Sequence, residues 1–333
     1  MKNSISDKTV QSHYPIIIVG GGPIGLACGI EAQKAGIESL IIEKGTIVNS
    51  LFNYPRNMTF FSSSERLELD DIPFVSINSK PNRNEALEYY RRIADVKKLN
   101  IHLFEKIESI QKSDSGIFNI ISDKSNYTAN NVIIATGFYD LPYLLNVPGE
   151  ALPKVKHYYD DPHMYAFQKV VVVGAMNSAV DAALETWRKG ADVTMVIRGS
   201  EIGTRVKYWV KPDIENRIKE GSIKAYFNSE IVKIEKDSVE ISTPEGPLTL
   251  PNDWVLALTG YQPNIEFLRN TGIRLSDDEQ LKPEYNETTY ETNIKGLYVA
   301  GVVCGGMDTH SYFIENSREH AKAIVRSIVM NNE

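Results

Sequence analysis

The chain has 333 residues, a length typical of two domains rather than of one small module. Hydrophobic residues make up 42% and charged residues 24%, an ordinary globular composition that excludes a largely disordered chain. The net charge of −7, without a block of Lys and Arg, argues against nucleic acid as a partner. The longest apolar runs are too short to span a bilayer, and residues 1–13 lack the apolar core of a signal peptide. Two cysteines are too few for a disulfide scaffold, so we expect a cytoplasmic protein that does not bind membranes.

Residues 15–45 read as an apolar run, a glycine-bearing loop, a stretch of helical period and a second apolar run. The same order of features returns without gaps at residues 169–199, where Gly174 aligns with Gly20. A short strand, a helix and a second strand form a βαβ unit, and two such units imply parallel sheets. The sequence therefore predicts an α/β protein with two Rossmann-like, three-layer domains.

A second repeated pattern marks the passage between these domains. IIATGFY at 133–139 and LALTGYQ at 256–262 each end a short apolar run in Thr-Gly, and four prolines follow the first of them. GLYVAGVV at 296–303 reads as a last strand that returns to the first domain. We therefore expect one discontinuous domain with another inserted into it, with bounds 1–140 and 263–333 for the first and 141–262 for the second.

The first glycine loop, residues 20–25, fits the G-x-G-x-x-G pattern directly after a strand and before a helix. In that pattern Gly20 allows a tight turn, Gly22 lets the backbone approach a pyrophosphate, and Gly25 lets helix and strand pack closely. Phosphates would lie at the positive end of the helix, and Glu43 is the acid expected to bind ribose hydroxyls. The plainer alternative is a tight turn without a ligand.

The second glycine loop departs from this pattern. Met176 replaces the middle glycine, and Ile197 stands where the first unit has its acid, followed at once by Arg198. A guanidinium in place of a carboxylate favours a 2′-phosphate, so we expect NADPH rather than NADH, although Arg198 as a solvated surface charge remains the alternative. The predicted NADPH-binding residues are Gly174, Met176, Asn177, Ser178, Arg198, Arg205 and Lys207.

Beyond these loops, the chain resembles the thioredoxin-reductase-like flavoproteins over nearly its whole length, and within them the YpdA-type bacillithiol-disulfide (bacilliredoxin) reductases. The resemblance rests on IIEKGTIVNSLFNYPRNMTFFSSSERLELDDIPF at 41–74, NSAVDAALE at 177–185, LTGYQPNIEFL at 258–268 and TYETNIKGLYVAGVV at 289–303. It implies bound FAD, NADPH as reductant, and a small-molecule disulfide or a small redox protein as electron acceptor. It also makes a homodimer or higher homo-oligomer plausible.

The resemblance also implies which residues approach the FAD. The stretch 53–64 would lie along the flavin and offer hydroxyls to it, with a Ser-rich turn as the alternative. Gly301 and the helix start near Ile314 would approach the ribityl chain. Together with the first loop, the predicted FAD-binding residues are Gly20, Gly22, Pro23, Ile24, Gly25, Glu43, Lys44, Asn53, Thr59, Ser62, Ser63, Ala135, Gly137, Gly301 and Ile314.

One residue departs from the family that the chain resembles. That family carries a cysteine in its first glycine loop, GGGPCG, where this chain has Ile24, and the chain also lacks a Cys-x-x-Cys. The weak catalytic candidates are Cys28, Cys304 and His310, and a Cys28–Cys304 redox pair is one hypothesis. The alternative is that both cysteines are small core residues. No histidine spacing indicates a metal site.

The leading hypothesis is therefore an FAD-containing, NADPH-dependent oxidoreductase that reduces a bacillithiol-type disulfide. Three alternatives stay open at this point: a ferredoxin- or flavodoxin-NADP reductase, a flavin monooxygenase, and a flavin-binding redox sensor without enzymatic activity. The chain lacks the F-x-G-x-x-x-H signature of flavin monooxygenases, which argues against the second of these alternatives. The sensor would follow if Met176 prevented nicotinamide binding.

Overall fold

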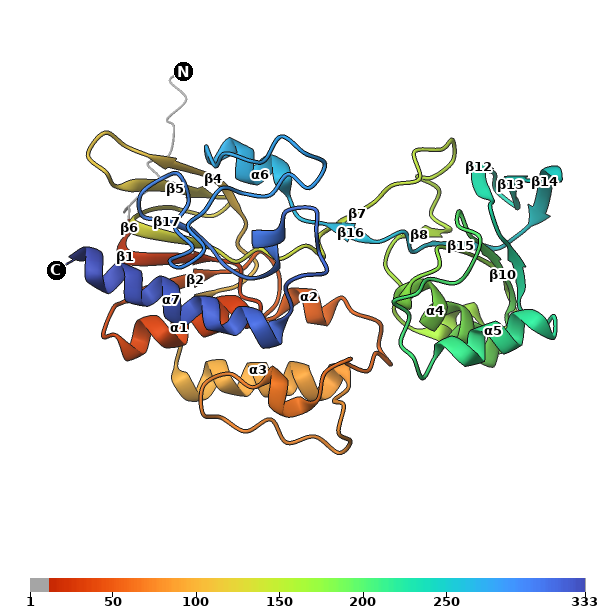
Figure 1. Cartoon of the computed structure of the whole chain (residues 1–333), viewed down its shortest axis with the longest axis horizontal. Helices are drawn as coiled ribbons and strands as arrows, with labels where there is room; N and C mark the ends of the chain where they lie inside the picture. Colours follow the sequence, from red (N-terminus) through yellow and green to blue (C-terminus); the bar gives the residue numbers. More distant parts are fainter. Residues whose placement is uncertain (1–11, 333) are drawn as a thin grey trace, which may run out of the picture. The chain divides into compact units, whose positions relative to one another are not determined.

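A computed structural model describes residues 12–332 and divides them into two compact units (Figure 1). The first unit contains the described residues up to Phe52, Ser62–Leu141 and the described residues from Gln262 onward. The second unit contains Asn53–Phe61 and Pro142–Tyr261. Residues 53–61 thus group with the second unit, whereas the sequence-based bounds had assigned them to the first.

The first unit is built on a seven-stranded sheet with the order β3-β2-β1-β6-β5-β4, in which β17 also pairs with β6. Strands β1, β2, β3, β6 and β17 pair in parallel, while β4 and β5 add an antiparallel edge. The apolar run at 16–19 is buried on both faces, as expected for an inner parallel strand. The strands are β1 Ser12–Val19, β2 Ser39–Ile42, β3 Ile101–His102, β4 Ile107–Lys112, β5 Phe118–Ser122, β6 Asn126–Ile134 and β17 Leu297–Val299.

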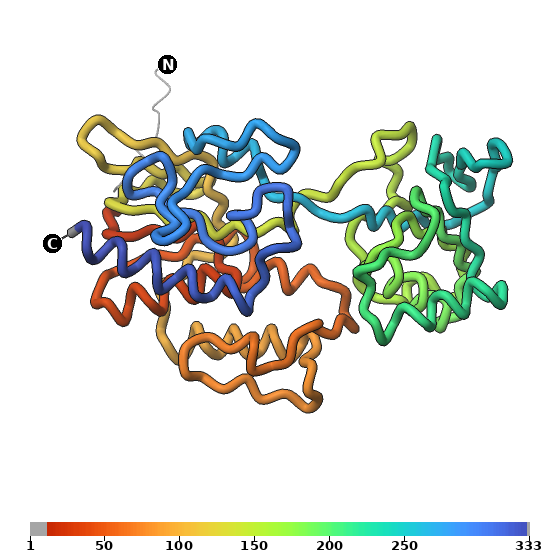
Figure 2. Tube along the Cα trace, viewed as in Figure 1, coloured from red at the N-terminus to blue at the C-terminus, as the bar shows by residue number. Residues whose placement is uncertain are grey.

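Helices from opposite ends of the chain pack together in this unit. Helix α1 (Pro23–Lys34) lies beside α7 (Ile314–Asn332), as Figure 2 shows by the red and blue segments. Helix α3 (Arg83–Lys97) begins with a capping box, in which the Asn82 side chain and Glu85 satisfy each other's backbone amides. The remaining helical elements are α2 Asn49–Phe52, α6 Ile265–Asn270 and the 3₁₀ turns η1 Ser64–Leu67 and η3 Gly301–Gly305.

The second unit has an all-parallel five-stranded sheet with the order β11-β10-β9-β15-β8 and a three-stranded antiparallel sheet β12-β13-β14. Its helices are α4 (Asn177–Arg188) and α5 (Lys211–Lys219), with the 3₁₀ turn η2 (Pro162–Tyr165). Its strands are β8 Val155–Lys156, β9 Lys169–Val173, β10 Asp192–Val196, β11 Lys224–Tyr226, β12 Glu230–Ile234, β13 Ser238–Thr243, β14 Gly246–Pro251 and β15 Trp254–Ala257. Each parallel βαβ unit predicted from the sequence is present, which confirms the α/β class.

The two chain passages predicted at the Thr-Gly patterns form a two-stranded sheet, β7 (Leu141–Pro142) with β16 (Tyr261–Gln262). The strand expected near 296–303 is shorter, because the chain turns into η3 at Gly301. Within residues 12–332, no helix has both the length and the apolarity needed to cross a membrane.

Candidate functional site

The first glycine turn joins β1 to α1 and brings three glycines into distinct environments. Gly20 has a φ of +109°, and a Cβ there would lie 2.5 Å from the Ala135 carbonyl oxygen. A Cβ on Gly25 would lie 1.9 Å from the Gly20 carbonyl oxygen, so helix and strand pack through this residue. Gly22 is different, because a Cβ there would meet nothing within 4 Å. The turn is therefore closed on its protein side and open at Gly22.

The N-terminus of α1 leaves backbone donors at this open position. Gly22 is the N-cap residue and Pro23 is the first helical residue, which lacks an N–H. The first helical hydrogen bond runs from the Leu26 N–H to the Gly22 carbonyl at 2.9 Å, so the amides of Ile24 and Gly25 precede the helical ladder. An open glycine beside amides that have no acceptor within the helix, at a helix N-terminus, fits a phosphate group.

Glu43 follows β2 and holds the same turn with both of its carboxylate oxygens. Oε2 accepts the Gly21 N–H at 2.7 Å and Oε1 accepts the Gly45 N–H at 2.9 Å. The side chain is buried, and this desolvation raises the pKa of Glu43 against the effect of the two amides. Each oxygen keeps a lone pair that can accept a ribose hydroxyl.

A small pocket of the first unit adjoins this turn. Two of its lining residues, Lys44 and Asp140, form an ion pair at 2.7 Å. The lining combines glycine backbone, carboxylate and hydroxyl groups, which suits a nucleoside with its ribose and phosphates. The lining includes Gly20, Glu43, Lys44, Asn49, Ser50, Glu105, Thr136, Asp140 and Phe267. The residues present therefore fit the adenosine end of FAD.

The predicted row of flavin-lining hydroxyls does not belong to a single unit. Asn53 and Thr59 lie in the second unit, while Ser62 and Ser63 lie in the first. The Ser62 hydroxyl already donates to Glu315 Oε1 at 2.6 Å, next to the first residue of α7, Ile314. The stretch 53–64 is thus divided between the two units, because residues 53–61 group with the distant residues 142–261 of the second unit.

Gly301 begins the turn η3 and is enclosed from two sides. It has a φ of +85°, and Ile24 Cγ1 would lie 3.3 Å from a Cβ at this position. Its N–H donates to His320 Nδ1 at 3.2 Å. The buried His320 also stacks on Tyr290 at a ring-centroid distance of 4.1 Å. Sequence reasoning had assigned no role to His320, and its place on the inner side of α7 is the signal that could have drawn attention to it.

The other positions expected near this region also lie in the first unit. Ala135 follows β6 and donates its N–H to the Val19 carbonyl at 2.8 Å. Gly137 has a φ of +72° and lies near the Ser50 hydroxyl. Both residues thus follow the carboxyl end of β6, next to the carboxyl end of β1 where the first glycine turn begins.

The thiols of the chain are inaccessible in this structure. Cys28 and Cys304 both have an exposed fraction of 0%. Burial raises the pKa of Cys28 to about 12 and raises the pKa of Cys304 as well. Cys304 Sγ lies 3.8 Å from His320 Nδ1, but burial lowers the pKa of His320 to about 4, so the pair is neutral. A thiol–disulfide relay requires an accessible thiolate, which neither residue supplies here.

The third catalytic candidate, His310, is exposed in the loop between η3 and α7. Its backbone N–H donates to Asp308 Oδ1 at 3.0 Å. His310 is therefore accessible to solvent, in contrast to the two cysteines.

The second glycine turn joins β9 to α4 in the second unit. Gly174 has a φ of +127°, and a Cβ there would lie 2.5 Å from the Leu258 carbonyl oxygen. Met176, the N-cap residue of α4, turns its sulfur toward Gly203, 2.3 Å from where a Cβ of Gly203 would stand. Gly203 also donates its N–H to the Ala175 carbonyl at 3.0 Å. Met176, which replaces the middle glycine of the pattern, thus packs its side chain on Gly203.

The positive charges predicted near this turn differ in their surroundings. Lys207 is buried and forms an ion pair with Asp181 at 2.9 Å. Arg198 and Arg205 are both exposed, and neither guanidinium has an ion pair with another described residue. Asn177, the first residue of α4, accepts the Lys207 N–H at 2.9 Å and donates to the Arg205 carbonyl at 3.2 Å. Of the three, only the two arginines have a charge available for a phosphate.

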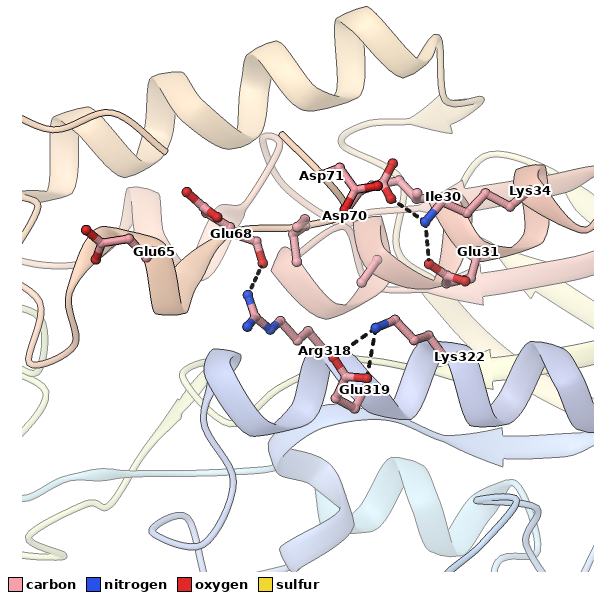
Figure 3. Close-up of a pocket in the computed structure, with 12 residues that line it drawn as sticks. Ile30, Glu31, Lys34, Glu65, Glu68, Asp70, Asp71, Arg318, Glu319 and Lys322 are labelled. Atoms are coloured by element: carbon pink, nitrogen blue, oxygen red, sulfur yellow. Dashed lines mark hydrogen bonds and ion pairs between the residues drawn. The ribbon is translucent and has the colours of Figure 1, made fainter. Parts of the chain in front are cut away.

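A charged pocket elsewhere in the first unit lies between α1, η1 and α7 (Figure 3). Lys34 pairs there with Glu31 at 2.9 Å and with Asp70, and Lys322 pairs with Glu319 at 2.9 Å. None of the predicted site residues lines this pocket, so it is separate from the dinucleotide turn.

Comparison with known proteins identifies the family of the chain. The family described as pyridine nucleotide-disulphide oxidoreductase matches residues 17–301. Bacilliredoxin reductase Bdr of Bacillus subtilis (strain 168) is 44% identical over 313 residues, covering 94% of this chain and 96% of the relative. These matches span both glycine turns.

Solved structures agree with the sequence relatives. Bacillithiol disulfide reductase Bdr (YpdA) from Staphylococcus aureus superimposes with a TM-score of 0.94 at 40% identity, covering 97% of this chain and all of that one. The protein of the same name from Bacillus cereus gives a TM-score of 0.93 at 42% identity, covering 96% of this chain and all of that one. The cofactors of the enzyme are FAD and NADPH, and the two glycine turns fit such dinucleotides. The chain belongs to the pyridine nucleotide-disulphide oxidoreductase family and, within it, to the group of the bacilliredoxin reductases Bdr (YpdA).

Proposed function

We propose that this enzyme oxidises NADPH and reduces a small-molecule disulfide of the bacillithiol type. The supporting observation is 40% to 44% identity, over nearly the whole chain, to relatives named for that substrate or for bacilliredoxin. The overall reaction consumes NADPH, one proton and the disulfide, and it yields NADP⁺ and two thiols. Bound FAD would supply the two-electron chemistry that couples hydride removal from NADPH to reduction of the disulfide.

In this proposal the first unit holds FAD through backbone and one carboxylate. The amides of Ile24 and Gly25 face the pyrophosphate at the open Gly22 position, and Glu43 accepts hydroxyls of the adenosine ribose. Glu43 keeps the turn in shape at the same time, because it bonds the amides of Gly21 and Gly45. The hydroxyls of Ser62 and Ser63 and the backbone of Gly301 complete the proposed contacts on the flavin side.

The second unit binds NADPH at the turn before α4. Arg198 and Arg205 pair with the 2′-phosphate, while the N-terminus of α4 at Asn177 and Ser178 receives the pyrophosphate. Lys207 holds Asp181 and shapes the loop rather than binding phosphate. The preference for NADPH therefore depends on the two exposed arginines.

No step of the proposed reaction uses a thiol of the chain. Cys28 and Cys304 are inaccessible, and Ile24 contributes an aliphatic side chain over Gly301. The substrate disulfide is therefore reduced without a mixed disulfide to the protein. Two buried, unlinked thiols are compatible with a reducing cytoplasm, and a cytoplasmic homodimer is part of the proposal, to be checked by light scattering of the purified protein.

The test is anaerobic reduction of the purified holoprotein followed by a panel of acceptors. We expect NADPH to bleach the flavin absorbance and bacillithiol disulfide to restore it with continued NADPH oxidation. NADH serves as the matched control for the reductant, and ferredoxin and oxygen serve as controls for the acceptor. NADPH oxidation at the substrate-free rate would remove the disulfide from the proposal. Failure of NADPH to bleach the flavin would favour a non-enzymatic sensor instead.

A further inference from the structure

Three aromatic side chains gather on the surface of the second unit. Phe61 is 60% exposed, Tyr208 is 73% exposed and Trp209 is 37% exposed. The ring centroids of Phe61 and Trp209 lie 5.5 Å apart, and those of Tyr208 and Trp209 lie 4.9 Å apart at an angle of 86°. Contiguous exposed aromatic surface is costly to leave in water and marks binding sites. We call these three residues the aromatic cluster.

The aromatic cluster is fixed close to the N-terminus of α4. The loop after β10 crosses the second glycine turn, since Gly203 donates its N–H to the Ala175 carbonyl at 3.0 Å. It then reaches the first residue of the helix, where the Lys207 N–H donates to Asn177 Oδ1 at 2.9 Å. Tyr208 and Trp209 follow Lys207 directly, so their rings begin within two residues of the proposed pyrophosphate site.

The third member of the cluster, Phe61, belongs to a segment that is anchored beside β8, at one edge of the parallel sheet. Phe61 ends the segment 53–61, in which Arg56 pairs with Asp161 at 2.9 Å and donates its N–H to the Asp160 carbonyl at 3.0 Å. Asp160 and Asp161 follow β8, which lies beyond β15, while Arg198 follows β10 on the other side of β9. The α4 N-terminus therefore lies between Arg198 and the anchoring point of the segment that carries Phe61.

A bound dinucleotide has the same linear order as these three features. Its 2′-phosphate and adenine share one ribose, the pyrophosphate stands in the middle, and the nicotinamide is at the far end. With the 2′-phosphate on Arg198 and the pyrophosphate at α4, the nicotinamide half extends toward the cluster. Oxidised nicotinamide is also a planar cation, and the face of an indole ring attracts cations.

We propose that the aromatic cluster is the binding surface for the nicotinamide ring, with Trp209 as its central residue. This inference rests on the NADPH site proposed above. It assigns the binding of the nicotinamide ring, which neither glycine turn contacts in this proposal, to Phe61, Tyr208 and Trp209.

The test compares the holoenzyme with Trp209→Ala, Trp209→Phe and Tyr208→Ala by calorimetric titration. The probes are NADP⁺ and 2′,5′-ADP, which has the adenine half and the 2′-phosphate but no nicotinamide. We expect Trp209→Ala to weaken NADP⁺ binding about tenfold, as loss of a stacked ring does, and Tyr208→Ala to weaken it less. Binding of 2′,5′-ADP should change less than about twofold, and Trp209→Phe should recover most of the NADP⁺ affinity. Phe167→Ala is the matched control, because Phe167 is an 87% exposed aromatic residue of the same unit outside the cluster.

The outcomes separate this inference from the function on which it rests. Unchanged NADP⁺ binding in both Trp209→Ala and Tyr208→Ala would overturn the inference and leave the NADPH site in place. Equal weakening of NADP⁺ and 2′,5′-ADP would also overturn it, because the cluster would then contact the adenine half. If the wild-type protein binds neither probe, the NADPH site and the inference both fail.

Discussion

Replacing Gly25 by alanine tests whether the first glycine turn depends on close packing. The added Cβ would stand 1.9 Å from the Gly20 carbonyl oxygen, whereas ordinary van der Waals contact begins at 3.4 Å. The first turn of α1 would have to move away from β1 by about 1.5 Å. The contact cannot be relieved easily, because β1 is paired on both edges and the Gly20 atoms that the Cβ would meet belong to the backbone. Overpacking of this kind costs about 1–3 kcal/mol, occasionally more.

We therefore expect Gly25→Ala to lose about 3 kcal/mol of unfolding free energy, a fall of roughly 6–12 °C in the Tm of the first unit. Gly22→Ala is the matched control, since its Cβ meets nothing within 4 Å and its φ of −73° suits any residue. It should keep the wild-type Tm in the absence of FAD but lose at least about tenfold in FAD affinity, because its methyl group would occupy the phosphate approach.

The measurements are thermal unfolding of the FAD-free proteins by circular dichroism and FAD titration by flavin fluorescence. A Tm for FAD-free Gly25→Ala equal to that of the wild type would refute the packing argument. FAD binding by Gly22→Ala at wild-type affinity would show that the pyrophosphate does not pass this residue.

Three further predictions follow from the site. Arg198→Ala should raise the KM for NADPH at least about tenfold and leave that for NADH unchanged, and an equal preference in wild type and variant would contradict the 2′-phosphate assignment. Burial lowers the pKa of His320 to about 4, below the ordinary value of about 6.5, so the unfolded chain binds the extra proton between these pH values. The unfolding free energy should therefore fall as pH drops from about 6.5 to 4, by about 3 kcal/mol at most, and stay level above that range. Urea unfolding at several pH values measures this slope, and an identical slope in His320→Asn would assign it to other groups. Finally, iodoacetamide should label neither Cys28 nor Cys304 in the native protein and both after unfolding, as mass spectrometry can show; rapid native labelling of either would restore the thiol relay.

The sequence was most informative where structure is local. The two βαβ units were predicted because apolar runs, glycine turns and helical periods follow one another within about thirty residues. The distinct environments of Gly22 and Gly25 arise in the same way, since both are set by residues of the same turn, whereas the close contact of Gly20 is with the distant Ala135 carbonyl. Local pattern thus predicts both the α/β class and the position of the turns.

What the sequence did not predict depends on partners far away along the chain. Met176 packs on Gly203, and Lys207 pairs with Asp181, yet no pattern in the sequence joins the members of either pair. Residues 53–61 likewise group with the second unit through ion pairs such as Arg56 with Asp161. Such contacts form only after the chain has folded back on itself, so propensity and periodicity carry no sign of them.

The late position of β17 has a consequence for synthesis on the ribosome. This strand pairs with β6, Leu297 beside Val132, and it emerges only after all of residues 142–261. The inserted unit can therefore finish folding while the surrounding unit still lacks a strand and its last helix. During that interval residues 132–134 of β6 are unpaired on the edge away from β1, beyond the part that β5 covers, so the nascent protein can pair there with other chains until β17 emerges.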